Sequence, residues 1–432
     1  MFDWANSVYP LVILSTIFPA YYSDMAVQVG EDEIILFGQQ LKNTFVLDVV
    51  LSLACLIVAF MNPVLSGIAD ASGKKLTYLK RFNLIGVVGC LSLFFFDNEH
   101  IWVGLFGAFV ASIGYSGSLV FYNAYLPEIV DEEDQDRISA KGFSYGYLGS
   151  ALYLILVLIT TFYLSSNYQD YEFLPQDSTI VKHEIFRWSF IGLGIWWLGF
   201  ARITFNRLPS NVYKKKISKD MLSAGLKELK QVYSSLKTMP ELKRFLCSFA
   251  IFSLAVQTMI LVAAFFGKKE INFPKESVDA YLIIMVLIIQ FVGMLGAWFF
   301  ARLSKKKGNV ASLTFGLISY LIACIIAFIV TEPTPFMCLA ALVGFGMGGI
   351  QAMARSTYSK LLPQTEDHAS YFSFFDFVEK MSIVFGLLLY GTLEQITGSQ
   401  RMSVLVLTFV FLIALVIIYP LRKSDKLKGE NQ

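Results

Sequence analysis

Long apolar stretches separated by short polar connections make up most of this 432-residue chain. A helix of about 20 apolar residues crosses the hydrocarbon core of a bilayer, and twelve stretches are long enough. The pattern therefore predicts an all-α membrane protein with twelve transmembrane helices. The predicted spans are 3–22, 44–69, 77–97, 101–127, 142–164, 184–206, 242–267, 278–302, 310–331, 335–358, 369–394 and 401–421.

A polar connection over 207–241 divides the predicted spans into two groups of six. Within it, apolar residues from Ile217 to Leu236 recur at helical spacing with lysines between them, which predicts a basic amphipathic helix. Such a helix lies on the inner membrane face or against the helix ends, and its simplest role is that of a tether. We therefore expect an N-terminal six-helix bundle over 1–206, a cytoplasmic linker over 207–241, and a C-terminal bundle with a short tail over 242–432.

Lysine and arginine are concentrated in alternate connections, including the loop after the second span, the middle connection and the C-terminal tail. Cytoplasmic loops of membrane proteins carry this excess of basic residues. Both termini and the middle connection are therefore predicted to be cytoplasmic, in agreement with an even number of spans. The first span opens with polar residues and no basic segment, so we do not expect a cleaved signal peptide.

The composition agrees with a membrane protein and argues against several other classes. Hydrophobic residues make up 56% of the chain and charged residues 16%, compared with about 25% in soluble domains. The five cysteines lie in apolar runs without paired spacing, so we expect neither disulfides nor a metal site. The sequence contains no HExxH motif and no phosphate-binding G-x-x-x-x-G-K-[ST] loop. We therefore expect no enzyme, no cofactor and no nucleic-acid partner.

The eleventh predicted span carries Asp376, Glu379 and Lys380 in the middle of an apolar helix. Lys380 lies roughly 16 Å along the helix from Ala369, about half the thickness of a hydrocarbon core. Charged groups at that depth are costly unless they face water or a partner, so they are usually functional. Spacings of three and four place them on one helical face. We interpret them as substrate-binding or coupling residues; the alternative is a salt bridge that only fixes packing.

The two halves of the chain resemble each other. A Leu-Pro pair ends the fourth span at 126–127 and the tenth at 362–363, and F-S-Y and F-S-F open the spans that follow. The same order of features in the same orientation is typical of carriers built from parallel six-helix repeats. On this pairing, Tyr147 of the first half matches Asp376 of the second.

The loop after the second span reads SGIADASGKK and resembles the G-x-x-x-D-R-x-G-R-K signature of the major facilitator superfamily. The matching residues are Asp70, Gly73, Lys74 and Lys75. A tight turn needs the glycine, the aspartate can cap or bridge to a neighbouring helix end, and the lysines are expected at the lipid headgroups. The first glycine and the first basic position of the signature are replaced, so the gating network implied by the resemblance is thinner here.

Three stretches carry a closer resemblance: 2–22 with its D-W-A-N-S opening, 123–150, and 344–380. They look like the vacuolar amino-acid effluxer-like (autophagy-related) family of the major facilitator superfamily. The resemblance implies a major facilitator fold, with two six-helix bundles around a central cavity that opens by alternating access. Because fungal members are associated with amino-acid export from the vacuole, amino acids are the implied substrate class.

Polar residues near the ends of other spans are further candidates. Asn6 lies inside the first span, where it lines the cavity or belongs to a helix cap. Asp48 lies about one turn into the second span and is interpreted as a coupling group or outer gate, with a structural hydrogen bond as the alternative. The acidic run before Arg137 is interpreted as a solvated loop, in which Arg137 bridges helix ends.

The tenth span contains the motif G-x-G-x-x-G at 344–349, followed by Gln351 and Arg355. No strand precedes the glycines, so close helix packing explains them better than nucleotide binding. Arg355 is interpreted as binding an anionic substrate group or pairing with Asp376; the alternative is extension to the headgroups.

We therefore predict a permease-type secondary active transporter that moves a small solute, with amino acids implied, by alternating access. Protonation of Asp376 or Glu379 is the candidate coupling step. The alternatives are a lipid or amphiphile transporter of the same fold and a non-transporting membrane receptor. We expect a monomer in the cytoplasmic membrane of a bacterium, with the substrate, protons and membrane lipids as its partners.

Overall fold

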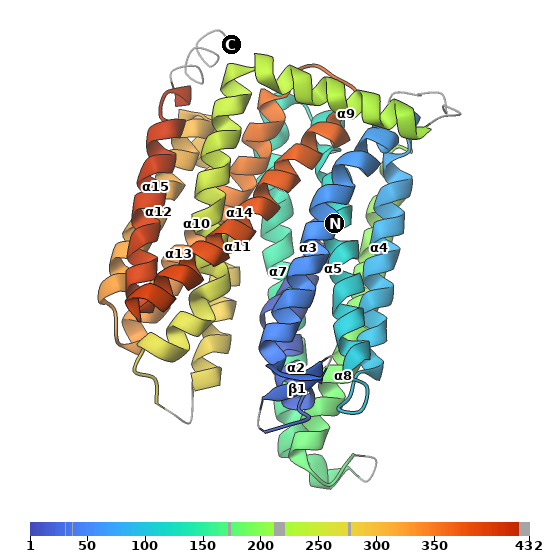
Figure 1. Ribbon diagram of the computed structural model, residues 1–432, viewed down its shortest axis with the longest axis vertical. Coiled ribbons are helices and arrows are strands. Elements are labelled where there is room, and N and C mark those ends of the chain that lie inside the picture. Colours follow the sequence, from blue (N-terminus) through green and yellow to red (C-terminus); the bar gives the residue numbers. More distant parts are fainter. Residues whose placement is uncertain (31, 37, 172–173, 211–220, 275–277, 423–432) are drawn as a thin grey trace. The chain divides into compact units, whose positions relative to one another are not determined.

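The computed structural model describes residues 1–30, 32–36, 38–171, 174–210, 221–274 and 278–422. Most of this chain is helical (Figure 1). The elements of the first half are α1 (Phe2–Asn6), the π-helical η1 (Pro10–Ser15), α2 (Ile17–Met25), β1 (Glu33–Leu36), β2 (Gln39–Lys42), α3 (Asn43–Ser72), α4 (Lys75–Ser92), η2 (Leu93–Phe95), α5 (Ile101–Asn123), α6 (Leu126–Ile129), η3 (Glu132–Asp134), α7 (Gln135–Ser166), η4 (Tyr168–Asp170) and α8 (Ser178–Phe205). Those of the second half are α9 (Met221–Thr238), α10 (Pro240–Glu270), α11 (Val278–Lys307), α12 (Asn309–Ile329), α13 (Pro333–Leu361), α14 (His368–Thr397) and α15 (Gln400–Ile418).

Nine helices of the described chain are long and apolar enough to cross a membrane, and they coincide with nine of the predicted spans. The other three predicted spans are also helical. The first is divided into α1, η1 and α2, the first half of α8 carries charged residues, and α14 carries the three ionisable residues described above. These features lower the mean hydropathy or shorten the continuous helix. The prediction of an all-α membrane protein is confirmed.

The first span contains an interruption that its hydropathy did not predict. The segment η1 begins at Pro10, and the backbone leaves the helical region at Thr16, with φ −134° and ψ −86°, before α2 begins. Pro19 follows in the first turn of α2. Proline lacks a backbone N–H and clashes with the preceding turn, so two prolines in one span favour a break between them.

The connection between α2 and α3, predicted only as polar, contains a small antiparallel hairpin. Strands β1 and β2 pair with Glu33 opposite Lys42 and Leu36 opposite Gln39. Gly38 in the turn has φ +80°, a conformation that glycine adopts readily.

The chain forms two compact units. The first comprises Met1–Val58, Leu76–Leu119 and Leu148–Ser210, and the second comprises Ala59–Lys75, Val120–Tyr147 and Asn211–Gln432. Segments of α3, α5, α6 and α7 from the first half of the chain therefore pack with the second half. The division into bundles over 1–206 and 242–432 stays a prediction.

In the second unit, α13 packs closely against α11 through glycines. A Cβ atom added to Gly344 would lie 2.7 Å from the backbone oxygen of Ile289, and one added to Gly348 would overlap the backbone carbonyl of Gly293. Side chains at these positions would force the helices apart. The interpretation of 344–349 as a close-packing motif is therefore confirmed.

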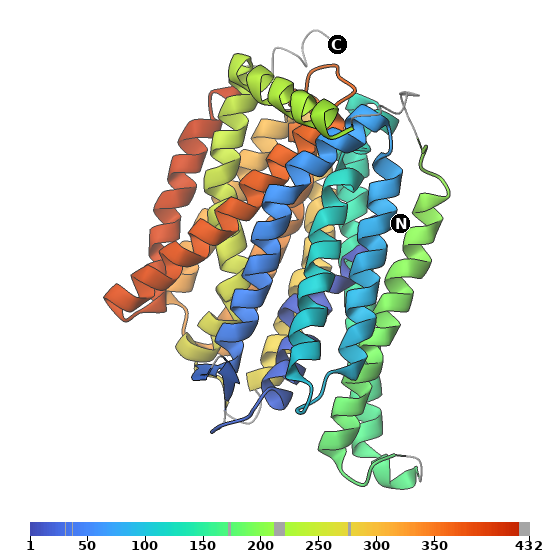
Figure 2. The ribbon, with the colours of Figure 1, turned by 45° about the vertical axis from the view of Figure 1, so that its right-hand side comes forward.

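The middle connection contains α9, which lies crosswise to α10 and α14 in both views (Figures 1 and 2). The segment is helical from Met221 to Thr238, as predicted for this part of the connection. The first part of the predicted helix, with Ile217 and Lys219, and the lysines of the C-terminal tail lie outside the described residues.

Candidate functional site

Three ionisable residues of α14 and two amide side chains of other helices form a largely buried group that we call the carboxylate cluster: Asn62, Gln257, Asp376, Glu379 and Lys380. Asp376 and Lys380 are each 5% exposed and form an ion pair one helical turn apart. Asp376 also accepts a 3.0 Å hydrogen bond from Asn62 Nδ2 of α3. The predicted salt bridge is therefore present, and it is also joined to a second helix.

Glu379 has a different partner. Gln257 Nε2 of α10 donates a 3.0 Å hydrogen bond to Glu379 Oε1. Ser382, three residues after Glu379, donates a hydrogen bond to the backbone oxygen of Ala250 in α10. The two contacts hold α14 against α10 along this stretch. The two carboxylates consequently face different helices, although their spacing along α14 suggested a single face.

Sequence reasoning missed Asn62 and Gln257. Each is an isolated polar residue inside an apolar predicted span, and this is the signal that could have identified them. A protonated Asp376 would no longer attract Lys380 as an ion and would accept less strongly from Asn62, so protonation would weaken one contact between α3 and α14.

Another group lies at the N-terminus of α14. We call it the first end cluster, and it consists of Asp70, Lys75, Glu128 and His368 with the adjoining backbone. Asp70 accepts hydrogen bonds from the backbone N–H groups of Ala369, at 3.3 Å, and Ser370, at 2.7 Å. A carboxylate at a helix N-terminus satisfies unpaired N–H groups and complements the helix dipole. The prediction that Asp70 bridges to a neighbouring helix end is confirmed.

The turn that presents Asp70 contains Gly73, whose φ of +66° confirms the predicted requirement for glycine. Lys75 was expected at the lipid headgroups, and for this residue the expectation is wrong. It is 4% exposed and forms ion pairs with Glu128 and, at 3.4 Å, with Asp70. The two neighbouring carboxylates compensate the charge of the buried Lys75. Lys74 beside it is half-buried.

Glu128 also lies 3.2 Å from Nδ1 of His368, the first residue of α14. Its side chain is fully buried. In the acidic run that follows, residues 131–134 are exposed, as expected of a solvated loop, whereas Asp136 at its end is buried. The first end cluster therefore joins α3, α6 and α14 through charged groups removed from water.

A further group, the second end cluster, is built around Asp136 at the start of α7. Its carboxylate accepts hydrogen bonds from Ser304 at 2.9 Å, Asn309 at 2.6 Å and Lys360 at 2.8 Å. The donors lie at the end of α11, the start of α12 and the end of α13. The loop 301–308 has no acidic residue, and in the structure the acid comes from α7 instead.

Arg137 was predicted to bridge helix ends. In the structure it forms a 3.0 Å ion pair with Asp134, three residues earlier, and both side chains are largely exposed. The bridging contacts at this position are those of the adjacent Asp136.

Arg355 of α13 is 6% exposed and does not extend to the surface. It donates hydrogen bonds to Oγ and the backbone oxygen of Ser139, at 3.0 and 2.9 Å, and to Asn123 Oδ1 at 3.3 Å. Its guanidinium also lies 4.5 Å from the ring centre of Phe143. These contacts join α13 to α5 and α7, so headgroup contact, the alternative considered above, is wrong.

Gln351, one turn before Arg355, accepts a 2.6 Å hydrogen bond from the hydroxyl of Tyr147. Tyr147 therefore joins α7 to α13, although the repeat pairing matches it with Asp376. The structure brings these two predicted site residues together.

In the first unit, Asn6 is 1% exposed and its Nδ2 has no hydrogen-bond partner among the described residues. Beside it, Trp4 stacks on Trp196 at 5.5 Å. Asp48 of α3 is exposed. Its role as an outer gate or coupling group stays a prediction.

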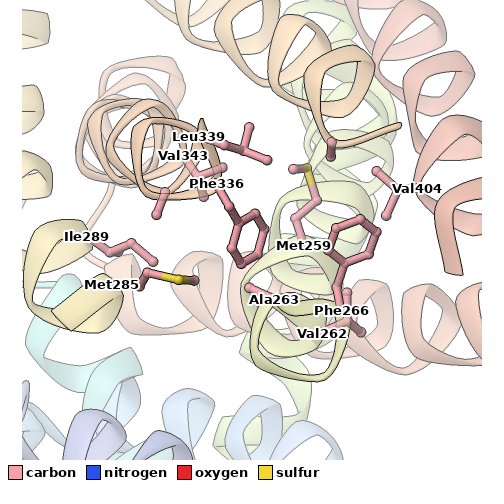
Figure 3. Close-up of a pocket in the computed structure, with 12 residues that line it drawn as sticks. Met259, Val262, Ala263, Phe266, Met285, Ile289, Phe336, Leu339, Val343 and Val404 are labelled. Atoms are coloured by element: carbon pink, nitrogen blue, oxygen red, sulfur yellow. The ribbon is translucent and has the colours of Figure 1, made fainter. Parts of the chain in front are cut away.

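An apolar cavity in the second unit lies apart from these polar groups (Figure 3). It is surrounded by α10, α11, α12, α13 and α15, and every lining residue is apolar. The lining includes Met259, Phe266, Met285, Phe336 and Val404, which point toward one another in Figure 3. None of the predicted site residues lines this cavity.

Comparisons with known proteins show which family the chain is similar to. A family model described as "Vacuole effluxer Atg22 like" matches residues 1–430. An uncharacterized MFS-type transporter of Bacillus subtilis, YxiO, is 27% identical over 419 residues, which cover 97% of this chain and 92% of YxiO. Autophagy-related protein 22 of Eremothecium gossypii is 23% identical over 480 residues, covering 97% of this chain and 90% of that protein.

Solved structures of major facilitator superfamily transporters have the same fold. The crystal structure of FucP in the outward conformation matches with a TM-score of 0.69 at 12% identity, covering 98% of this chain and 96% of FucP. The human organic anion transporter MFSD10 (TETRAN) matches with a TM-score of 0.69 at 11% identity, covering 96% of each chain. At these identities the likeness concerns the fold alone, and it confirms the predicted major facilitator fold.

Proposed function

The chain belongs to the vacuole effluxer Atg22-like family of membrane transporters, and from this premise we propose that it is a secondary transporter that moves a small solute by alternating access. Amino acids are the first substrate class to test. The observation that carries the proposal is the carboxylate cluster: two carboxylates and a lysine in the interior of a membrane helix, with amide partners on two other helices.

This cluster is expensive to bury. Ionisable groups inside a membrane cost several kcal/mol even when paired, and apolar residues of similar size would pack there at lower cost. A packing role alone therefore explains the cluster poorly, whereas binding a charged solute or a proton explains it directly.

The two end clusters support alternating access. They join α3, α6 and α7 to helices of the second half of the chain through ion pairs and hydrogen bonds at helix ends. Such contacts make and break as discrete sets, which is the property required of a gate between two states. We assign both clusters to the gate at the side where Lys and Arg are concentrated, and this distribution favours the cytoplasmic side.

Proton coupling would act through Asp376 or Glu379. Protonation of Asp376 would weaken its contacts with Lys380 and Asn62, and so loosen α14 from α3. The negative charge paired with Lys380 would then be lost, so Lys380 would attract an anionic substrate group more strongly, for example the carboxylate of an amino acid.

The test uses Asp376→Asn and Glu379→Gln in proteoliposomes, with labelled amino acids selected by a thermal-shift screen of the purified protein. Both variants should retain a folded monodisperse protein and lose proton-driven uptake. Glu394→Gln, on the outer part of the same helix where Glu394 pairs with Lys269, is the matched control and should transport normally. Wild-type flux in both site variants would remove these carboxylates from the mechanism.

A second candidate function is supported by the apolar cavity. Its lining offers contacts to an aliphatic chain and no hydrogen-bonding side chain, which favours a lipid or amphiphile substrate. A fluorescent-lipid transbilayer assay on the same proteoliposomes separates the two candidates. Lipid movement without amino-acid counterflow would favour this second function.

We further propose that the protein resides in the cytoplasmic membrane of a bacterium with both termini inside. The bacterial relative YxiO and the distribution of Lys and Arg support this placement. Fusion of a reporter that is active only in the cytoplasm to the C-terminus tests it, and an inactive reporter would contradict it.

A further inference from the structure

Helix α9 has two different faces. On the buried face, Gly225 packs against the backbone of Gly67 in α3, and no Cβ atom would fit between them. Seven and ten residues later, Val232 is 3% exposed and Ser235 Oγ lies 2.6 Å from the hydroxyl of Tyr371 in α14. The buried face therefore bridges the ends of α3 and α14.

The opposite face of α9 is basic and partly apolar, and it is exposed. Leu226, Lys230, Tyr233 and Lys237 follow each other at spacings of four, three and four, so they form one stripe, with Lys227 beside it. Leu226 is 48% exposed and Tyr233 is 53% exposed. The ammonium group of Lys237 lies 4.7 Å from the Tyr233 ring centre. Glu228 is the single acidic residue in the sequence of this helix.

This stripe continues into exposed apolar surface of the membrane helices. The Tyr233 ring stacks on Phe374 of α14 at 6.2 Å. One turn further along α14, Phe377 contacts Phe60 of α3 at 5.7 Å, and Phe60 is 64% exposed. Exposed aromatic residues on membrane helices contact lipid. An aromatic stripe therefore runs from α9 onto α14 and α3, with the lysines of α9 at its end.

We propose that the exposed face of α9, formed by Leu226, Lys227, Lys230, Tyr233 and Lys237, binds the headgroups of anionic phospholipids. The charge of three lysines complements a negatively charged leaflet, and an aliphatic and an aromatic side chain between them enter the headgroup boundary. Because the other face of α9 bridges α3 and α14, bound lipid stabilises the arrangement in which these two helix ends lie together. Only this last consequence rests on the proposed function.

The experiment is hydrogen–deuterium exchange of the full-length protein in nanodiscs of phosphatidylcholine alone or with added phosphatidylglycerol. Anionic lipid should slow exchange in the peptide that covers α9. In the variant K227Q/K230Q/K237Q this slowing should be lost. Each lysine is expected to contribute roughly fivefold to the affinity of α9 for an anionic surface. The readout requires no transport, so it is independent of the outcome of the flux experiments.

Three controls keep the result interpretable. K305Q/K306Q/K307Q removes the same charge from exposed lysines at the end of α11 and should retain the slowing of α9 exchange. K227R/K230R/K237R keeps the charge and should also retain it, which guards against a general folding defect. Inorganic phosphate added to phosphatidylcholine nanodiscs should have no effect. Equal exchange of wild-type α9 in both lipids, full slowing in the glutamine variant, or slowing by phosphate would each overturn the proposal.

Discussion

Asn62 of α3 donates a 3.0 Å hydrogen bond to Asp376 of α14, across 314 positions of the chain. Asn62 is fully buried, and its Oδ1 has no hydrogen-bond partner among the described residues. The contact ties the most buried carboxylate of α14 to a helix from the other half of the sequence. Through this hydrogen bond, the Asp376–Lys380 ion pair within α14 is also connected to α3.

Replacing Asn62 with alanine should destabilise the protein by about 1.5–3 kcal/mol, the usual contribution of a hydrogen bond to a charged group. The melting temperature of the purified variant measures this effect. Because the lost contact is shared with Asp376, the double variant Asn62→Ala with Asp376→Asn should be less destabilised than the sum of the two single changes. Additive effects would show that the two residues do not interact.

Asn83 provides the control for this prediction. It is also a buried amide, 1% exposed, but neither its nitrogen nor its oxygen has a hydrogen-bond partner in the described chain. Asn83→Ala should therefore cost less than Asn62→Ala and should not couple to Asp376→Asn.

Arg355→Lys should lower the melting temperature although it conserves the charge. The guanidinium donates to Ser139 through two nitrogens, to Asn123 through a third, and lies over the Phe143 ring. A lysine ammonium cannot reproduce that planar geometry, and the loss is expected to be about 2 kcal/mol. Arg81→Lys, at an exposed position, is the control and should be neutral. Equal melting temperatures for the two variants would show that the Arg355 contacts contribute little.

The second end cluster predicts charge complementation. Asp136→Lys and Lys360→Asp should each destabilise the protein strongly, because each places like charges together in a site where Asp136 is 6% exposed. The double exchange restores opposite charges and should recover part of the lost stability, as measured by melting temperature. The exposed pair formed by Asp134 and Arg137 should show little effect when either partner is changed to alanine. A double variant no better than the worse single variant would contradict the assignment.

The sequence predicted features that depend on one helix or one turn. The spacing of Asp376 and Lys380 predicted their ion pair, and the loop motif predicted the turn at Gly73 and the role of Asp70. It did not predict the partners that arrive from other helices, such as Asn62. Periodicity reports which face of a helix a residue occupies, but it does not report which helix lies opposite.

Lys75 illustrates the same limit. A lysine that follows a membrane helix usually extends to the headgroups, and the sequence contains no local sign that this one is buried. Its burial depends on Glu128, which is brought beside it only when α6 packs on the ends of α3 and α14. The burial of a charged side chain can be predicted from its neighbours in sequence only where those neighbours are also its partners in the folded protein.

The close approach of α11 and α13 predicts opposite effects for two glycine substitutions. A Cβ atom at Gly348 would overlap the carbonyl of Gly293 and lie 3.1 Å from the backbone nitrogen of Ala297, so Gly348→Ala forces backbone atoms apart and should cost about 1–3 kcal/mol. A Cβ atom at Gly391, in α14, would meet nothing within 4 Å, so Gly391→Ala should be neutral or stabilising by up to about 1 kcal/mol. Melting temperatures in one detergent measure both, and a Gly348→Ala protein as stable as the Gly391→Ala protein would refute the close packing of α11 and α13.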